Sequence, residues 1–110
     1  MMGRPDLGEM EHLVLLAILR LGQDAYGIPI LDEVSGQSGR EVSRATVYVA
    51  LRRLERKGLV TSHLGDSTPE RGGRAKRFFT LTPAGLKTLR KARTRFLRLW
   101  RRYETALGRA

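Results

Sequence analysis

The sequence predicts a mainly α-helical fold with one small β-hairpin (α+β), arranged as a winged helix-turn-helix followed by a long C-terminal helix. Two observations carry this prediction. Apolar residues recur at helical spacing in four segments of the chain. Two short β-prone runs lie between the third and fourth segments, separated by a loop rich in glycine, proline and serine. The length of 110 residues fits one compact body, since roughly 100–200 residues per domain is usual.

The first helix should begin after Pro5, with Asp6 as a candidate N-cap, and should end at Gly22. Further apolar residues, Leu13 among them, lie outside its main apolar face. That face consists of Leu7, Met10, Val14, Ala17, Ile18 and Leu21. A helix that is apolar on most sides is usually buried on most sides. We therefore expect a second surface to cover it, such as one from another subunit.

The second helix should begin near Tyr26 or Gly27. Pro29 limits its start, because proline has no N–H and is tolerated only in the first turn of a helix. We expect this helix to run to about Ser35, and residues 36–39 to form a turn on composition alone.

The third helix has clear boundaries. Ser43 suits its N-cap, and Gly58 suits the left-handed residue that follows its end. One face holds Val47, Ala50, Leu51 and Leu54, and the opposite face holds Ala45, Tyr48, Val49, Arg52 and Arg56. A charged outer face is ordinarily just solvated, but Tyr48 and Val49 are poor choices for solubility. With the short helix before it, this segment has helix-turn-helix spacing.

The β-prone runs 59–64 and 77–81 predict a hairpin with its tip at about residues 66–75. The loop contains Arg71, Gly72, Gly73 and Arg74, which combine flexible backbone with positive charge. Such a loop alone is most often a plain turn. Directly after a helix-turn-helix, it predicts a wing.

The last helix should open at Thr82 as N-cap and Pro83 at the first position. Its seam resembles that of a coiled coil, and about twenty-five residues make it close to 37 Å long. A body of this size cannot cover all of that seam, and exposed apolar patches usually mark interfaces. We therefore expect a homodimer whose interface contains Leu13, Leu86, Leu89, Phe96, Trp100, Tyr103 and Leu107, with Arg93 as the polar interruption of the seam.

The charge distribution predicts a nucleic-acid partner. The chain has a formal net charge of +10 and a sequence pI near 11.2. Residues 1–39 have a net charge of −4, residues 40–77 of +6 and residues 78–110 of +8. The cations therefore begin where the third helix begins, which favours a binding face over general solubility. The chain divides into a DNA-binding unit, residues 1–82, and a dimerisation helix, residues 83–110.

We expect double-stranded DNA to be bound by helix 43–57 in the major groove and by the wing, 66–76, on the phosphate backbone. Arg52 is the best candidate for a bidentate contact to guanine. Val49 could pack on a thymine methyl group, and Tyr48 could bond a phosphate. The full set of expected DNA-binding residues is Ser43, Arg44, Ala45, Thr46, Tyr48, Val49, Arg52, Arg53, Arg71, Gly72, Gly73, Arg74 and Lys76.

Catalysis is not expected. The chain has no cysteine, its two histidines are His12 and His63, and neither has a second ligand at metal spacing on its own segment. No phosphate-binding glycine pattern precedes a helix, so we expect no cofactor and no metal. Neither a signal peptide nor a membrane span is recognisable, which favours a cytoplasmic protein.

Two other functions stay open. The winged helix could dock a protein, with the basic face incidental to that contact. Alternatively, a small aromatic effector could bind at the dimer interface, where Phe96, Trp100 and Tyr103 share one stripe. Such a stripe is more often core than ligand site, and an effector would act as a control on DNA binding.

The assembled segments resemble the PadR family of bacterial transcriptional regulators. The resemblance lies in LGEMEHLVLLAIL, DAYGIPI, SRATVYVALRRLERKGLV and PERGGRAKRFFTLTPAG, in this order along the chain. It implies a winged helix-turn-helix, dimerisation through the first and last helices, and repression of a nearby promoter. Larger members have an additional C-terminal helical region, whereas this chain ends soon after Tyr103. An effector pocket built wholly from that region is therefore not expected.

Overall fold

The computed structural model describes residues 7–65 and 75–110. In chain order its elements are α1 (Glu9–Leu21), a short 3₁₀ helix η1 (Gly22–Asp24), α2 (Gly27–Ser38), α3 (Arg44–Arg56), β1 (Val60–Leu64), β2 (Arg77–Leu81) and α4 (Pro83–Arg109). This is the predicted class, mainly helical with one antiparallel hairpin and a long last helix.

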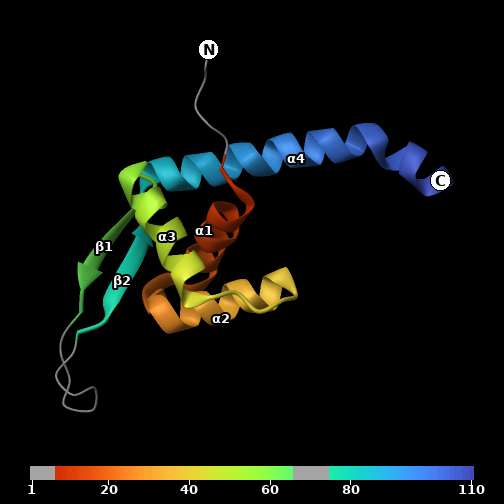
Figure 1. Cartoon of the computed structure of the whole chain (residues 1–110). Coiled ribbons are helices and arrows are strands. Elements are labelled where there is room, and N and C mark those ends of the chain that lie inside the picture. Colours follow the sequence, from red (N-terminus) through yellow and green to blue (C-terminus); the bar gives the residue numbers. More distant parts are fainter. Residues whose placement is uncertain (1–6, 66–74) are drawn as a thin grey trace.

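Helix α1 lies at the centre of the body, with α2 and α3 packed against it and the hairpin beside it (Figure 1). Helix α4 crosses one end of the body, and its C-terminal half extends beyond it (Figure 1). The core draws on every main element. Its largest fully buried side chains are Val14 and Leu15 of α1, Ile30 and Val34 of α2, Val47, Leu51 and Leu54 of α3, and Val60 of β1. Burying one such side chain stabilises the fold by about 1.5–3 kcal/mol.

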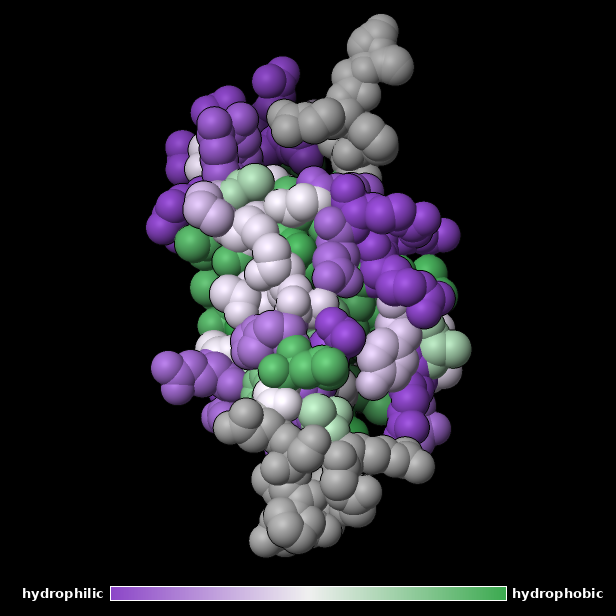
Figure 2. Space-filling view, turned by 90° about the vertical axis from the view of Figure 1, so that its left-hand side faces the viewer, coloured by the Kyte–Doolittle hydropathy of each residue, from purple (hydrophilic) through white to green (hydrophobic). Residues whose placement is uncertain are grey.

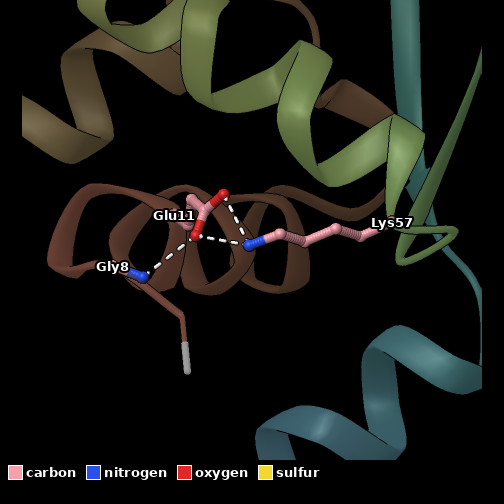
Figure 3. Close-up of polar contacts among 3 residues, drawn as sticks. All are labelled: Gly8, Glu11 and Lys57. Atoms are coloured by element: carbon pink, nitrogen blue, oxygen red, sulfur yellow. Dashed lines mark hydrogen bonds and ion pairs between the residues drawn. The ribbon is translucent and has the colours of Figure 1, made fainter. Parts of the chain in front are cut away.

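Helix α1 begins at Glu9 with Gly8 as its N-cap, later than expected, and Asp6 lies outside the described residues. A carboxylate inside the helix satisfies the cap: Glu11 Oε1 accepts a hydrogen bond of 2.9 Å from the Gly8 N–H. The Lys57 ammonium, just after α3, donates to both Glu11 oxygens at 2.9 Å (Figure 3). Although burial raises the pKa of the Glu11 carboxyl, the bond from Gly8 and the Lys57 charge together lower it below its ordinary value.

Helix α2 continues to Ser38, so the expected turn at residues 36–39 was wrong except at its last residue. Gly39 provides the left-handed end, with φ of 73°. One glycine inside a helix costs only about 1 kcal/mol. Within the added turn, the Gln37 amide donates to Glu33 at 2.8 Å, which ties it to the turn before.

The hairpin pairs β1 with β2 in the register Val60↔Leu81 to Leu64↔Arg77. A third segment joins this sheet at a single position that the sequence did not predict. Tyr26, just before α2, forms an isolated antiparallel bridge with Phe78, and the Phe79 N–H donates to the Ala25 carbonyl at 2.8 Å. The hairpin is therefore attached to the start of α2.

Helix α4 opens as expected. The Thr82 hydroxyl accepts from the Gly85 N–H at 3.0 Å and donates to the Gly58 carbonyl at 2.7 Å, which fixes the helix to the end of α3. Gly85, Leu89 and Ala92 are buried in the first turns of α4, and every residue from Arg93 onward is exposed. Within the described ranges, no helix is long and apolar enough to cross a membrane.

Candidate nucleic-acid interface

The start of α3 is fixed by the predicted cap. Ser43 Oγ accepts a hydrogen bond of 3.1 Å from the Thr46 N–H, and the two side-chain oxygens lie 2.8 Å apart. Both residues are exposed. Their side chains therefore hold the first turn, whose remaining N–H groups have no partner inside the helix. Such a helix start suits a phosphate.

The two faces of α3 are divided as predicted. Val47, Ala50, Leu51 and Leu54 are buried, and Arg44, Ala45, Arg52 and Arg53 are exposed. Among the residues that the structure describes, Arg44 and Arg52 have no hydrogen-bond or ion-pair partner. Their guanidinium groups are therefore available for another molecule. Val49 and Arg53 line a shallow hollow of 330 Å³ shared with the start of α1, which places them towards the edge of this face.

Tyr48 has a structural contact that the sequence did not predict. Its ring is 38% exposed, and its hydroxyl lies so close to Gly27 that a Cβ there would come within 2.5 Å of the oxygen. Tyr48 therefore sets the approach of α3 to the start of α2. The Tyr48 side chain, expected to contact DNA, therefore also packs against Gly27.

At the described root of the wing, aromatic rings pack together. The rings of Tyr26 and Phe78 lie 5.4 Å apart, and the His63 ring stacks on Phe78 at 5.7 Å. The Lys76 ammonium lies 3.8 Å from the centre of the Tyr26 ring, a cation–π contact. Lys76 is one of the expected DNA-binding residues of the wing, and this contact holds its ammonium against the body. Arg71, Gly72, Gly73 and Arg74 lie outside the described residues.

The consecutive residues Tyr26 and Gly27 thus contact both elements expected to bind DNA, the hairpin and α3. Tyr26 contacts the hairpin root through Phe78 and Lys76, and Gly27 contacts α3 through Tyr48. This pair of residues therefore links α3 to the hairpin. In the sequence, Tyr26 and Gly27 indicate only the start of a helix. A glycine directly before an apolar helical run, where no turn requires one, was the available signal of a close approach.

The residues expected at the dimer interface separate into two groups. Leu13 and Leu86 are half-buried, and Leu86 lines an open hollow of 420 Å³ between α1 and the hairpin. Leu89 is only 7% exposed and belongs to the core of its own chain, because the first turns of α4 pack on α1 and β2. Four members on the distal half of α4 are about half exposed: Phe96, Trp100, Tyr103 and Leu107.

Phe96 marks where α4 leaves the body, since its ring still meets the His12 ring of α1 edge-on at 6.2 Å. Beyond it, Leu97 and Leu99 are also exposed, so the distal apolar surface exceeds the predicted seam. Figure 2 shows the hairpin side of the molecule, where strongly hydrophilic side chains gather at the upper left and on the right. Across the described part of the chain, no three His, Asp or Glu side chains gather as metal ligands would.

Comparison with known proteins gives consistent matches. Residues 15–91 match the model of the transcriptional regulator PadR-like family. A relative from Lysinibacillus sphaericus, described only as an uncharacterized protein, is 31% identical over 88 residues, which cover 76% of each chain. A PadR family transcription regulator from Clostridium difficile R20291 has a similar structure, with a TM-score of 0.72 and 22% identity over 92% of this chain and 100% of that one.

A second similar structure is that of BpsR from Bordetella bronchiseptica, whose DNA binding is regulated by 6-hydroxynicotinic acid. It has a TM-score of 0.61 and 20% identity, and the match covers 82% of this chain and 59% of that chain.

Proposed function

Because this chain belongs to the PadR-like family of transcriptional regulators, we propose that it binds an inverted-repeat operator as a homodimer and represses a nearby promoter. The observation that carries the proposal is the outward face of α3. Its start is capped by Ser43, and its exposed Arg44 and Arg52 have no partner within the described chain. Helix-turn-helix proteins insert the start of such a helix into the major groove, where a guanidinium group can donate hydrogen bonds to guanine.

The proposed reading of DNA divides between α3 and the wing. Arg52 contacts guanine, because its two N–H donors match the O6 and N7 acceptors. The wing residues Arg71 and Arg74 contact phosphates, which adds affinity without sequence preference. Lys76 acts mainly at the root of the wing, where its contact with Tyr26 holds it.

The proposed dimer is formed by α1 and the distal half of α4. Phe96, Trp100, Tyr103 and Leu107 are all more than half exposed, and such contiguous apolar surface is unusual on a monomer. A two-fold dimer is the commonest oligomer, and it places two α3 helices on an inverted repeat. The half-sites then lie about 34 Å, or a multiple of this, apart. In this proposal residues 1–82 are the DNA-binding unit and residues 83–110 the dimerisation helix, with the chain acting in the cytoplasm.

Footprinting on the DNA upstream of the protein's own gene tests the proposal. We expect a protected inverted repeat, and reporter expression from that promoter should rise when the gene is deleted. A protected DNA segment that is not an inverted repeat would contradict binding as a two-fold dimer. Binding with no dependence on salt would favour the protein-docking alternative, because contacts to several phosphates make DNA binding steeply salt-dependent.

A second candidate function is control by a small aromatic effector, and the similarity to BpsR favours it. The stripe of Phe96, Trp100 and Tyr103 offers aromatic surface where two copies would meet. The chain has a single tryptophan, so its fluorescence reports directly on this stripe. Titration with 6-hydroxynicotinic acid should quench Trp100 and weaken operator binding over the same concentration range. Quenching without any change in DNA binding would reject the control function.

A further inference from the structure

Helix α4 has a second surface, the outer basic face, that the proposed dimer does not use. We define this face by Lys87, Lys91, Arg95, Arg98 and Arg102. At 100° per residue these positions lie opposite Leu89, Phe96 and Tyr103. Because Leu89 is buried against the body, the outer basic face points away from the body, and all five of its side chains are exposed.

The charge on α4 is of one sign. From Pro83 to Arg109 the helix has seven arginines and two lysines, and its single acidic residue is Glu104. A helix face that only needs solubility can alternate the two signs. Here like charges follow each other at a spacing of four residues in the pairs Lys87–Lys91, Lys91–Arg95 and Arg98–Arg102. Each such pair destabilises a helix by about 0.2–0.5 kcal/mol.

Most cations of this face have no acidic partner within the described chain. Arg20 pairs with Glu33 and Lys57 pairs with Glu11, both away from α4. Lys87, Lys91, Arg98 and Arg102 have no hydrogen-bond or ion-pair partner among the described residues. A polyanion would relieve the repulsion along the whole face.

The outer basic face is separated from the proposed operator-binding surface. Helix α3 begins beside α2, and the hairpin extends towards the same end of the body, whereas α4 crosses the opposite end (Figure 1). A duplex held by the start of α3 and by the wing therefore leaves the outer basic face open. Pairing of two chains through the apolar side of α4 also leaves it open, because the two sides of the helix are opposite.

The dimensions and chemistry favour duplex DNA as the polyanion. The outer basic face from Lys87 to Arg102 spans about 22 Å at 1.5 Å per residue, about two-thirds of one turn of a duplex. Arginine, the main cation here, binds phosphate with a two-pronged hydrogen-bond geometry. A lipid surface would instead take up the apolar side of an amphipathic helix. In α4 the body covers the first turns of that side at Leu89 and Ala92.

We propose that the outer basic face of α4 binds a second DNA duplex without sequence preference, so that one protein dimer bridges two DNA segments. This goes beyond operator recognition, which requires only α3 and the wing. It also gives the protein a way to hold an operator against a distant stretch of the same DNA.

A two-duplex capture assay tests the proposal. One duplex of about 35 base pairs, a little more than three helical turns and therefore longer than the basic face, is immobilised on beads, and an unrelated fluorescent duplex is in solution. The wild-type protein should retain the fluorescent duplex on the beads at low salt. The variant with Lys91→Gln, Arg98→Gln and Arg102→Gln should retain at least about tenfold less, because each lost phosphate contact weakens binding steeply. The same variant should still bind a single duplex, because α3 and the wing are unchanged. Anisotropy at limiting DNA measures this binding.

The matched control keeps the charge: Lys91→Arg, Arg98→Lys and Arg102→Lys together should bridge as the wild type does. Neither triple variant should melt below the wild type, since all three side chains are exposed and the glutamine variant also removes like-charge pairs. Undiminished bridging by the glutamine variant would overturn the proposal, because two α3 helices holding separate duplexes would then explain it. Capture of the protein by phosphatidylserine vesicles, with no bridging of DNA by the wild type, would overturn it in favour of a membrane surface.

Because both duplexes are unrelated to any operator, this assay is independent of the footprint. A missing inverted repeat would reject the proposed function and leave bridging intact. Loss of bridging only in the glutamine variant, together with a normal footprint, would support both.

Discussion

The contact between Gly27 and Tyr48 predicts the effect of Gly27→Ala. A Cβ at residue 27 would lie 2.5 Å from the Tyr48 hydroxyl oxygen, whereas ordinary contacts begin at 3.4 Å. The tip of the Tyr48 side chain must therefore move by about 1 Å, because it is the flexible partner in this contact. Gly27 does not have a positive φ, so alanine fits the backbone of α2 without strain.

The two energetic effects on stability nearly cancel. Displacing a side chain from its rotamer costs about 0.5–1.5 kcal/mol, and replacing glycine by alanine at a compatible position stabilises by about 0.4–1 kcal/mol. We expect a net change below about 1 kcal/mol, which is at most about 4–8 °C in Tm for a domain of this size. Operator binding should weaken by about 1 kcal/mol, roughly fivefold in Kd, because Tyr48 lies beside the proposed reading face.

Thermal melts and fluorescence anisotropy on the footprinted operator provide the measurements. The informative control is Tyr48→Phe, which removes the hydroxyl that the new Cβ would meet. The double variant Gly27→Ala, Tyr48→Phe should bind DNA as Tyr48→Phe alone does. Equal losses of affinity from Gly27→Ala in the presence and absence of the hydroxyl would show that the Gly27–Tyr48 contact does not act on DNA binding, and so would wild-type affinity in Gly27→Ala.

Three further predictions concern other parts of the molecule. Glu11→Gln should lower the free energy of unfolding by about 2 kcal/mol at neutral pH, because it leaves the Lys57 ammonium without its charged partner; chemical denaturation measures this. The pKa of Glu11 is lowered in the folded chain, so its contribution to the free energy of unfolding is present above the ordinary value of 4.5 and is lost as the pH falls below it. The difference in stability between the wild type and Glu11→Gln should therefore close at acid pH. Trp100→Ala should raise the dimer dissociation constant at least about tenfold, since buried aromatic anchors at interfaces contribute 2 kcal/mol or more, and an unchanged constant by light scattering or ultracentrifugation would reject the α4 interface. Arg71→Ala should weaken binding to every DNA sequence alike and reduce the slope of log K against log salt by about one unit; a change in the preferred sequence would show that Arg71 reads bases.

The features that sequence reasoning predicted correctly depend on local chemistry. Ser43 and Gly58 mark the two ends of α3, because a hydroxyl cap and a glycine with positive φ act within one turn of the helix. Thr82 and Pro83 likewise fix the start of α4. The buried and exposed faces of α3 follow from the helical period alone.

The features that could not be predicted from the sequence depend on contacts between distant segments. Lys76 and Tyr26 are fifty positions apart, and nothing in the sequence near either residue indicates that they meet. The apolar period of α4 places Leu89 and Phe96 on one stripe, yet only the packing of α4 on α1 shows that Leu89 belongs to the core while Phe96 stays half exposed. The composition of residues 36–39 predicts a turn, whereas the hydrogen bond from Gln37 to Glu33 supports a helix that continues to Ser38.

Selection of binding sites from random duplexes shows whether α3 reads base edges through Arg52. The wild-type protein should select an inverted repeat, and Arg52→Ala should cost about 1–3 kcal/mol on that site and relax the preference at one position in each half-site. A selected motif that is unchanged in Arg52→Ala, with affinity lowered equally for every sequence, would contradict this reading of bases and make Arg52 a phosphate contact.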